Sequence, residues 1–290
     1  MEHIRAGLYK VWEDSFYEER HYFDFFFTHG LPLGKQLYVG PDEAPYAALT
    51  LFPISFEQNG NIFPGFYLYA LGTLASARGK GYGKALVTDA KKYALEAGRQ
   101  FILLQPSNSG LFDYYLTLGF NHPVYQACLK LTRSNLSNIE SNSRLQQHIM
   151  MLSAPLTKTS DTTAQQAQHK YPALNRFVWP PYFLDYVRQE CIYRGGVVLD
   201  HTYCYPNTDI DGPFVEIKEF NTSFKHLPVL IDQILSAFPN SNRFYLYGKP
   251  PQKTKSQRIS EHPFALVSFI HPDLDAKYSP KSSYFALGLD

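Results

Sequence analysis

Residues 66–84 read FYLYALGTLASARGKGYGK and contain the most informative pattern of the sequence. Its first part, Phe66 to Thr73, is mostly apolar and predicts a central strand of a sheet. Three alternate glycines follow between positions 79 and 83, and a helix is expected over about 84–97. A strand, a glycine-rich loop and a helix in this order predict a backbone that passes close to a ligand.

The loop has the chemistry of a phosphate site. Without side chains, successive backbone amides can point at one anion, and a helix N-terminus adds about half a positive charge. Arg78, Lys80 and Lys84 place full positive charges around the loop. The predicted ligand group is therefore a phosphate or a pyrophosphate, with a solvent-exposed glycine-rich turn as the plain alternative.

Two common phosphate motifs do not fit this loop. A P-loop needs GxxxxGK[ST], but the residue five after Gly79 is Lys84 and not glycine, and Ala85 follows this lysine where the motif needs Ser or Thr. A Rossmann fingerprint needs GxGxxG after the first strand of a parallel sheet. Here the spacing is GxGxG, and the preceding strands are expected to form an antiparallel meander.

The flanking sequence predicts an α+β domain around this loop. Asn59-Gly60 is a hairpin signal between two strand-like stretches. Two short amphipathic helices are expected first, from Leu8 to Phe16 and from Tyr22 to Phe27. The other expected elements of this half are strands over 36–39, 46–54, 101–105 and 124–131, and a short helix that begins near residue 110.

The second half repeats this order of elements in weaker form. The polar stretch 134–152 is predicted to be an exposed linker between a first domain, 1–133, and a second domain, 153–290. No alternate glycines follow the strand expected over 214–220, so no second phosphate loop is predicted. The other expected elements are helices over 160–169, 181–193 and 227–238, and strands over 197–205, 243–247, 264–270 and 284–289.

Composition excludes several classes of protein. The 290 residues include 27 basic and 26 acidic side chains, with 44% hydrophobic residues, which is typical of a soluble globular protein. The near-neutral charge argues against bulk nucleic-acid binding, and no apolar run approaches the roughly 18 residues of a membrane helix. Cys128, Cys191 and Cys204 predict free thiols in a reducing compartment, the cytoplasm. Histidine spacing indicates no metal site.

Three motifs together resemble one known family. Arg78-x-x-Gly81-x-Gly83 resembles the acyl-CoA pyrophosphate loop of the GNAT superfamily of N-acyltransferases. Asn108 stands seven residues before Tyr115, and Tyr115 to Phe120 resembles the Tyr-x-x-x-Gly-Phe ending of that family. Ala75 departs from the family's usual proline. The resemblance covers residues 4–132 and implies a GNAT fold, a mostly antiparallel sheet flanked by helices.

The resemblance also implies a role for each site residue. The cofactor would be acetyl-CoA, its pantetheine arm bound by main chain like an added strand. Tyr115 would protonate the leaving thiolate, and the Thr73 amide would stabilise the oxyanion. Tyr114, about 100° around the helix, is expected to be a neutral control. The implied cofactor-binding residues are Leu71, Gly72, Thr73, Arg78, Gly79, Lys80, Gly81, Tyr82, Gly83, Lys84 and Asn108.

The implied function is an N-acetyltransferase that moves an acetyl group to a primary amine by direct attack in a ternary complex. The acceptor would be a small molecule or a peptide, with no nucleic acid, membrane or metal. No general base is identifiable, because Phe66 to Thr73 holds no acidic residue. Every implied cofactor contact precedes residue 120, which predicts that CoA contacts the first half only and not the second.

Two alternatives stay open at this point. The protein could be a non-catalytic acyl-CoA-binding or sensory module, which the missing base favours. The second half could be a degenerate GNAT-like repeat, as in tandem GNAT proteins, or an unrelated α+β domain. The sequence gives no indication of the oligomeric state.

Overall fold

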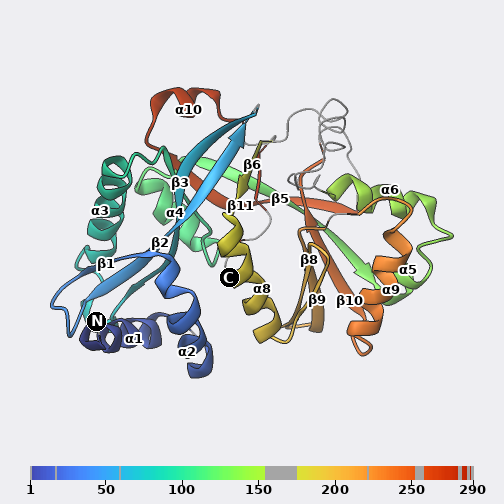
Figure 1. The fold of residues 1–290 in the computed structure, drawn as a ribbon, viewed down its shortest axis with the longest axis horizontal. Helices are drawn as coiled ribbons and strands as arrows, with labels where there is room; N and C mark the ends of the chain where they lie inside the picture. The colour runs from blue at the N-terminus through green and yellow to red at the C-terminus, as the bar shows by residue number, and fades with distance from the viewer. Residues whose placement is uncertain are drawn as a thin grey trace.

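The computed structural model describes residues 2–16, 18–58, 60–153, 175–220, 222–251, 258–279, 283–285 and 288. Twelve strands form one mixed, mostly antiparallel sheet with helices packed on it (Figure 1). The strand order is β12-β6-β2-β3-β4-β11-β5-β10-β9-β8-β7, and β1 pairs with β2. Within the described part of the chain no helix is long and apolar enough to span a membrane.

The elements have the following bounds. The strands are β1 Lys35–Val39, β2 Ala47–Gln58, β3 Asn61–Thr73, β4 Phe101–Leu104, β5 His122–Thr132, β6 Asn175–Val178, β7 Val197–Leu199, β8 Thr202–Asp209, β9 Gly212–Lys218, β10 Arg243–Gly248, β11 Ile259–Phe269 and β12 Ser283–Tyr284. The α-helices are α1 Glu2–Ser15, α2 Arg20–His29, α3 Tyr82–Glu96, α4 Gly110–Thr117, α5 Arg133–Ser137, α6 Ser143–Leu152, α8 Pro181–Tyr193, α9 Leu227–Ala237 and α10 Pro272–Lys277.

The predicted meander and its two covering helices are confirmed. Strands β1, β2 and β3 pair antiparallel in sequence order, and Gln58 pairs with Asn61 across the predicted hairpin. Helices α1 and α2 pack by their aromatic faces, with the rings of Trp12 and Phe26 stacked 4.4 Å apart. Each fully buried aromatic side chain of this kind contributes about 2–3 kcal/mol of hydrophobic free energy.

Strand β3 separates from its neighbour β4 before it ends. The two run parallel but pair only at Phe66–Ile102 and Tyr67–Leu103, and β4 ends at Leu104 while β3 continues to Thr73. The register between β2 and β3 also shifts near Ala70, whose φ of 53° is in the left-handed region. This bulge turns β3 away from β4, and among the described residues no strand pairs with that edge of residues 68–73.

The second half reproduces this arrangement. Strands β7, β8 and β9 form an antiparallel meander, and β9 connects through α9 to the parallel strand β10. Glu219 directly follows β9 with a φ of 51°, the counterpart of Ala70 in β3. The repeat expected from the order of elements is therefore present as a repeat of topology.

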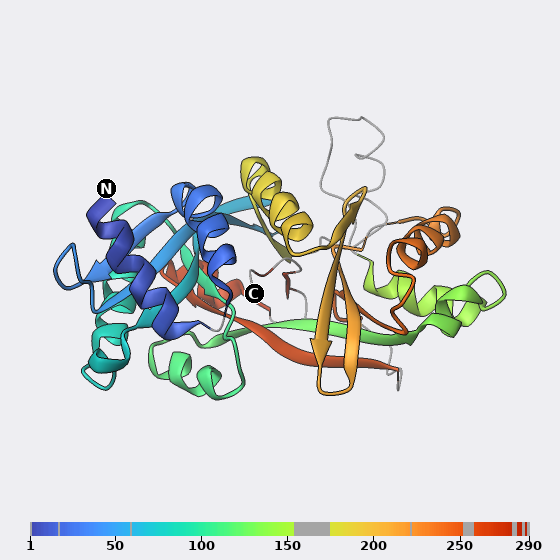
Figure 2. The same cartoon turned by 90° about the horizontal axis from the view of Figure 1, so that it is seen from below.

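The two halves exchange their last strands. Strand β11, from the second half, lies between β4 and β5, and β5, from the first half, lies between β11 and β10. Leu266 of β11, for example, pairs with Leu104 on one side and with Pro123 on the other. Figure 2 shows green β5 and red β11 running side by side across the molecule. The sheet is thus continuous through both halves.

The stretch expected to be an exposed linker, 134–152, contains two helices instead. Their apolar residues Leu136, Leu145 and Ile149 are at most 1% exposed and pack against β10 and α9. Thr132 caps α5 in a reciprocal capping box with Asn135, and Asn142 caps α6. Polar residues that indicated a loop are therefore helix caps. The helix expected over 160–169 lies outside the described residues.

Candidate functional site

The glycine loop leaves open space at the start of α3. Gly79 and Gly81 have φ values of 76° and 82°, and a Cβ built on either meets no atom within 4 Å. Gly81 is the N-cap of α3 and supplies no side-chain hydrogen bond. The first amides of α3 are therefore not capped by a side chain, and a positive electrostatic potential faces the open space.

A tyrosine from α4 reaches the first turn of α3. A Cβ built on Gly83 would lie 3.0 Å from the Tyr114 hydroxyl and 3.9 Å from Thr73 Oγ1. Burial raises the pKa of Tyr114, so its hydroxyl is a hydrogen-bond donor at neutral pH. The structure therefore brings Thr73, Gly83 and Tyr114 together. Tyr114, expected to be a neutral control, therefore has its hydroxyl beside the loop.

Tyr115 is more deeply placed than Tyr114. It is 8% exposed, and its ring contacts Tyr114 and Phe120 edge-on at centroid distances of 5.2 and 5.8 Å. Burial, with a smaller contribution from Tyr114, raises the pKa of Tyr115 well above its ordinary value. The hydroxyl therefore carries its proton at neutral pH and can act as a proton donor.

Two of the expected site residues are bound to the end of α1. The Thr73 amide donates to Ser15 Oγ at 3.1 Å, so the expected oxyanion donor already has an acceptor. Arg78 donates from Nε to the Thr73 carbonyl at 3.2 Å and from Nη2 to the Asp14 carbonyl at 2.5 Å. In this structure Arg78 therefore fixes the loop against α1.

The remaining expected residues surround the loop. Lys80, Lys84 and Asn108 are exposed, and no hydrogen bond between described residues joins the Asn108 side chain to the loop. Tyr82 stacks on Tyr46 at 5.2 Å. Leu71 and Gly72 are among the last residues of strand β3. A Cβ built on Gly72 would lie 2.7 Å from Ser15 Oγ. The main chain of β3 is thus closely covered on its α1 face.

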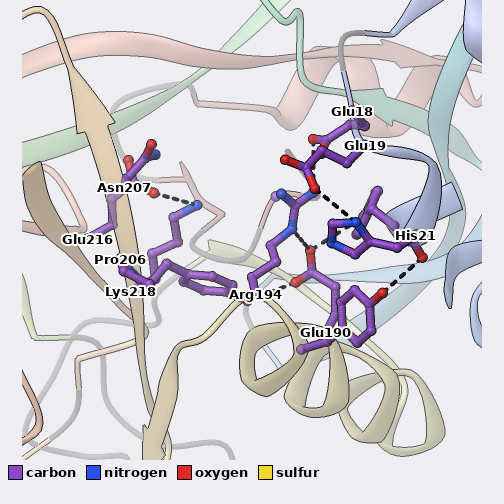
Figure 3. Close-up of a pocket in the computed structure, with 13 residues that line it drawn as sticks. Glu18, Glu19, His21, Glu190, Arg194, Pro206, Asn207, Glu216 and Lys218 are labelled. Carbon is purple, nitrogen blue, oxygen red and sulfur yellow. Dashed lines mark hydrogen bonds and ion pairs between the residues drawn. The ribbon is translucent and has the colours of Figure 1, made fainter.

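A cavity of about 380 Å³ lies between the two halves (Figure 3). Four carboxylates and two permanent cations, Arg194 and Lys218, line the cavity, so the carboxylates outnumber these cations. Arg194 pairs with Glu18 at 3.1 Å, and Lys218 pairs with Glu216 at 3.2 Å. The lining residues are Glu18, Glu19, His21, Tyr22, Glu190, Tyr193, Arg194, Tyr205, Pro206, Asn207, Glu216, Lys218 and Gly288.

One hydrogen-bonded contact links this cavity to β3. The hydroxyl of Tyr22, a cavity residue, lies 3.5 Å from the hydroxyl of Tyr69 on β3. Tyr69 directly precedes Ala70, the residue at the bulge. No sequence motif predicts this site, because its residues come from the α1–α2 connection, α2, α8 and the residue after it, β8, β9 and Gly288.

Comparison with known proteins agrees with this geometry. The acetyltransferase (GNAT) family matches residues 2–120. No curated protein matches the sequence closely enough to be a relative. The fold is similar to those of a GCN5-related N-acetyltransferase from Kribbella flavida (TM-score 0.60, 13% identity, covering 92% of this chain and 67% of that one) and a conserved protein of Enterococcus faecalis (0.62, 13%, 93% and 70%).

A third similar structure is Eis1 from Mycobacterium abscessus, with a TM-score of 0.54, 14% identity, and coverage of 95% of this chain and 72% of that one. At these identities the likeness concerns the fold, and it extends through both halves of the chain. The expected α+β class and GNAT fold are confirmed. Residues 2–120 belong to the acetyltransferase (GNAT) family, and the fold of GNAT proteins continues through most of the remaining chain.

Proposed function

We propose that the protein is an N-acetyltransferase that moves an acetyl group from acetyl-CoA to a primary amine by direct attack in a ternary complex. The observation that carries this proposal is the separation of β3 from β4 directly before an open, uncapped glycine loop. Uncapped amides fit an anionic diphosphate, and the unpaired edge of residues 68–73 fits the amides of a pantetheine arm. The residues present therefore fit acetyl-CoA, which supplies the activated thioester.

The chain's own residues have distinct tasks in this proposal. The protonated Tyr115 hydroxyl supplies the proton that the leaving thiolate needs. The loop amides and Lys80 and Lys84 hold the diphosphate, while Arg78 keeps the loop in position. The acidic cavity between the halves receives the acceptor, and its negative excess favours an amine with more than one positive charge.

One observation favours a second candidate, a non-catalytic acyl-CoA-binding module. The Thr73 amide donates to Ser15, so a developing oxyanion at that amide would have to displace the serine hydroxyl. The β3 segment from Phe66 to Thr73 also lacks a carboxylate. A binding module needs neither group.

A thiol-release assay separates the two candidates. Acetyl-CoA is offered with a panel of 1,4-diaminobutane, spermidine, an aminoglycoside and a peptide with a free N-terminus, and CoA binding is measured by calorimetry. We expect CoA binding and amine-dependent thiol release with at least one member. Binding without release from any amine would instead identify a binding module, and no binding at all would exclude both candidates.

Replacing Gly81 with valine is expected to weaken CoA binding by at least about 100-fold. The valine side chain would enter the open space where the diphosphate is expected, and its Cβ is strained at a φ of 82°. Gly98→Val is the matched control, because Gly98 follows the other end of α3 with a φ of 67° and equally open surroundings. Equal CoA affinity in the two variants, measured by calorimetry, would exclude the loop as the diphosphate site.

The proposal extends to location and partners. The three cysteines are buried and free, and burial raises the pKa of Cys128 to about 11, so they are not reactive thiols. Free thiols and an acetyl-CoA-dependent reaction fit the cytoplasm. No nucleic acid or membrane takes part in the proposed reaction.

A further inference from the structure

Glu190 is a carboxylate that the second half places in the cavity wall. It lies on α8, is 5% exposed, and lines the cavity between the halves. Its Oε1 pairs with Arg194 and accepts from the Tyr22 hydroxyl at 3.4 Å, while its Oε2 accepts from the Tyr205 hydroxyl at 3.3 Å. Figure 3 shows Arg194 lying between Glu18 and Glu190. A carboxylate so oriented is held at one fixed place in the cavity.

Two hydroxyls connect this carboxylate to the central strand. The hydroxyl of Tyr22 lies 3.5 Å from the hydroxyl of Tyr69, and either of them can be the donor. Tyr69 stands one residue before the bulge at which β3 leaves β4. Burial and the charge of Glu190 raise the pKa of Tyr22 to about 12, and burial raises that of Tyr69 well above its ordinary value. Both hydroxyls therefore remain protonated, so each can pass a proton on but neither stores a negative charge.

On the basis of the proposed function, we propose that Glu190 accepts the proton that the acceptor's ammonium group must lose. The ammonium gives one proton to the Tyr22 hydroxyl, which passes its own proton to Glu190 Oε1. The free amine then attacks the thioester carbonyl, the C–N bond forms and the C–S bond breaks. Tyr115 protonates the thiolate and is restored by the second proton of the nitrogen, and Glu190 releases its proton to solvent through the cavity.

The charged and titratable groups around Glu190 come from six parts of the fold. Tyr186 shares its helix and Arg194 directly follows that helix, while Tyr22 comes from α2 and Glu18 from the α1–α2 connection. Tyr205 of β8 contacts it directly, and Tyr69 of β3 reaches it through Tyr22. The β9 pair of Glu216 and Lys218 lies across the cavity. Because Glu18 also pairs with Arg194, a glutamine at position 190 leaves that arginine with an acidic partner.

The test is the pH dependence of kcat/KM for Glu190→Gln, with the fastest acceptor of the amine panel. At pH 7 the value is expected to fall roughly 10²-fold, within the range of general-base contributions. Above pH 7 the kcat/KM of the variant should rise tenfold per pH unit until the pKa of the amine is reached, because the variant can use only amine that is already deprotonated. Above that pH the deficit should shrink to less than about threefold.

Two tyrosine variants complete the design. Tyr22→Phe removes the hydroxyl that leads toward β3 and should show the same recovery at high pH. Tyr205→Phe removes the other hydroxyl on Glu190, at nearly the same distance. Because Tyr205 also lines the acceptor cavity, its variant is expected to lose the same fraction of kcat/KM at every pH, without recovery at high pH. CoA affinity and melting temperature are measured for all three variants, because a proton-transfer role predicts unchanged CoA affinity.

The outcomes are distinguishable. A deficit of Glu190→Gln that is the same at every pH would identify a structural glutamate and overturn the inference, while the proposed function would stand. Identical profiles for the two tyrosine variants would overturn the route through Tyr22. If wild-type protein acetylates no amine of the panel, the proposed function fails, and this inference fails with it.

Discussion

A fragment that ends at Arg133 is expected to be unfolded and unable to bind CoA, although it contains every residue implied for the cofactor. Its sheet would lack β11, which occupies the position between β4 and β5. Strand β4 is short, and its pairing with β3 covers only Phe66 and Tyr67, whereas β11 pairs with all four residues of β4. Circular dichroism, thermal melting and CoA calorimetry check this expectation.

A point variant tests the same dependence in the full chain. Val267 of β11 is fully buried and pairs with Leu103 of β4 and His122 of β5. Val267→Asp would bury an unpaired carboxylate and is expected to lower the free energy of unfolding by at least about 3 kcal/mol. Glu261→Gln, at an exposed position of the same strand, should be almost neutral. A fragment 1–133 that melts cooperatively and binds CoA as the full chain does would show that β11 is dispensable.

The elements around the glycine loop could be predicted because their signals are local. The helix expected over 84–97 is Tyr82–Glu96, and the central strand ends at Thr73 as expected. The exchange of β5 and β11 could not be predicted, because it joins strands more than a hundred residues apart whose apolar patterns fit several neighbours. The polar stretch after Thr132 was misinterpreted because serine and asparagine favour both loops and helix caps.

In the candidate site too, local features could be predicted from the sequence and long-range contacts could not. The family resemblance of the loop, Asn108 and Tyr115 implies a cofactor site, and the loop and α4 do lie together, as the approach of Tyr114 to Gly83 shows. Side-chain direction was not available from spacing, so Tyr114 was missed. The Ser15–Thr73 contact and the Glu190 cluster join residues far apart in sequence, with no motif to connect them. Long-range polar contacts of this kind depend on the complete fold.

Tyr115→Phe is expected to lower kcat and kcat/KM together by roughly 10²–10⁴-fold and to leave CoA affinity unchanged. The substitution removes only the phenolic proton, and the buried ring keeps its contacts with Tyr114 and Phe120. A general acid acts as the C–S bond breaks, so its loss affects the transition state and not the bound ground state. Steady-state kinetics with acetyl-CoA and the best amine, together with CoA calorimetry, measure both quantities.

Tyr114→Phe is the matched variant, and the geometry predicts the opposite pattern for it. The Tyr114 hydroxyl lies at the first turn of α3, where the diphosphate is expected, and not in the buried core that surrounds Tyr115. A lost hydrogen bond to a charged group costs about 1.5–3 kcal/mol, which corresponds to roughly tenfold or more in CoA affinity, with kcat nearly unchanged at saturation. If the two variants behave alike, or if Tyr115→Phe loses less than about threefold in kcat, Tyr115 is a structural tyrosine and the thiolate receives its proton from another group.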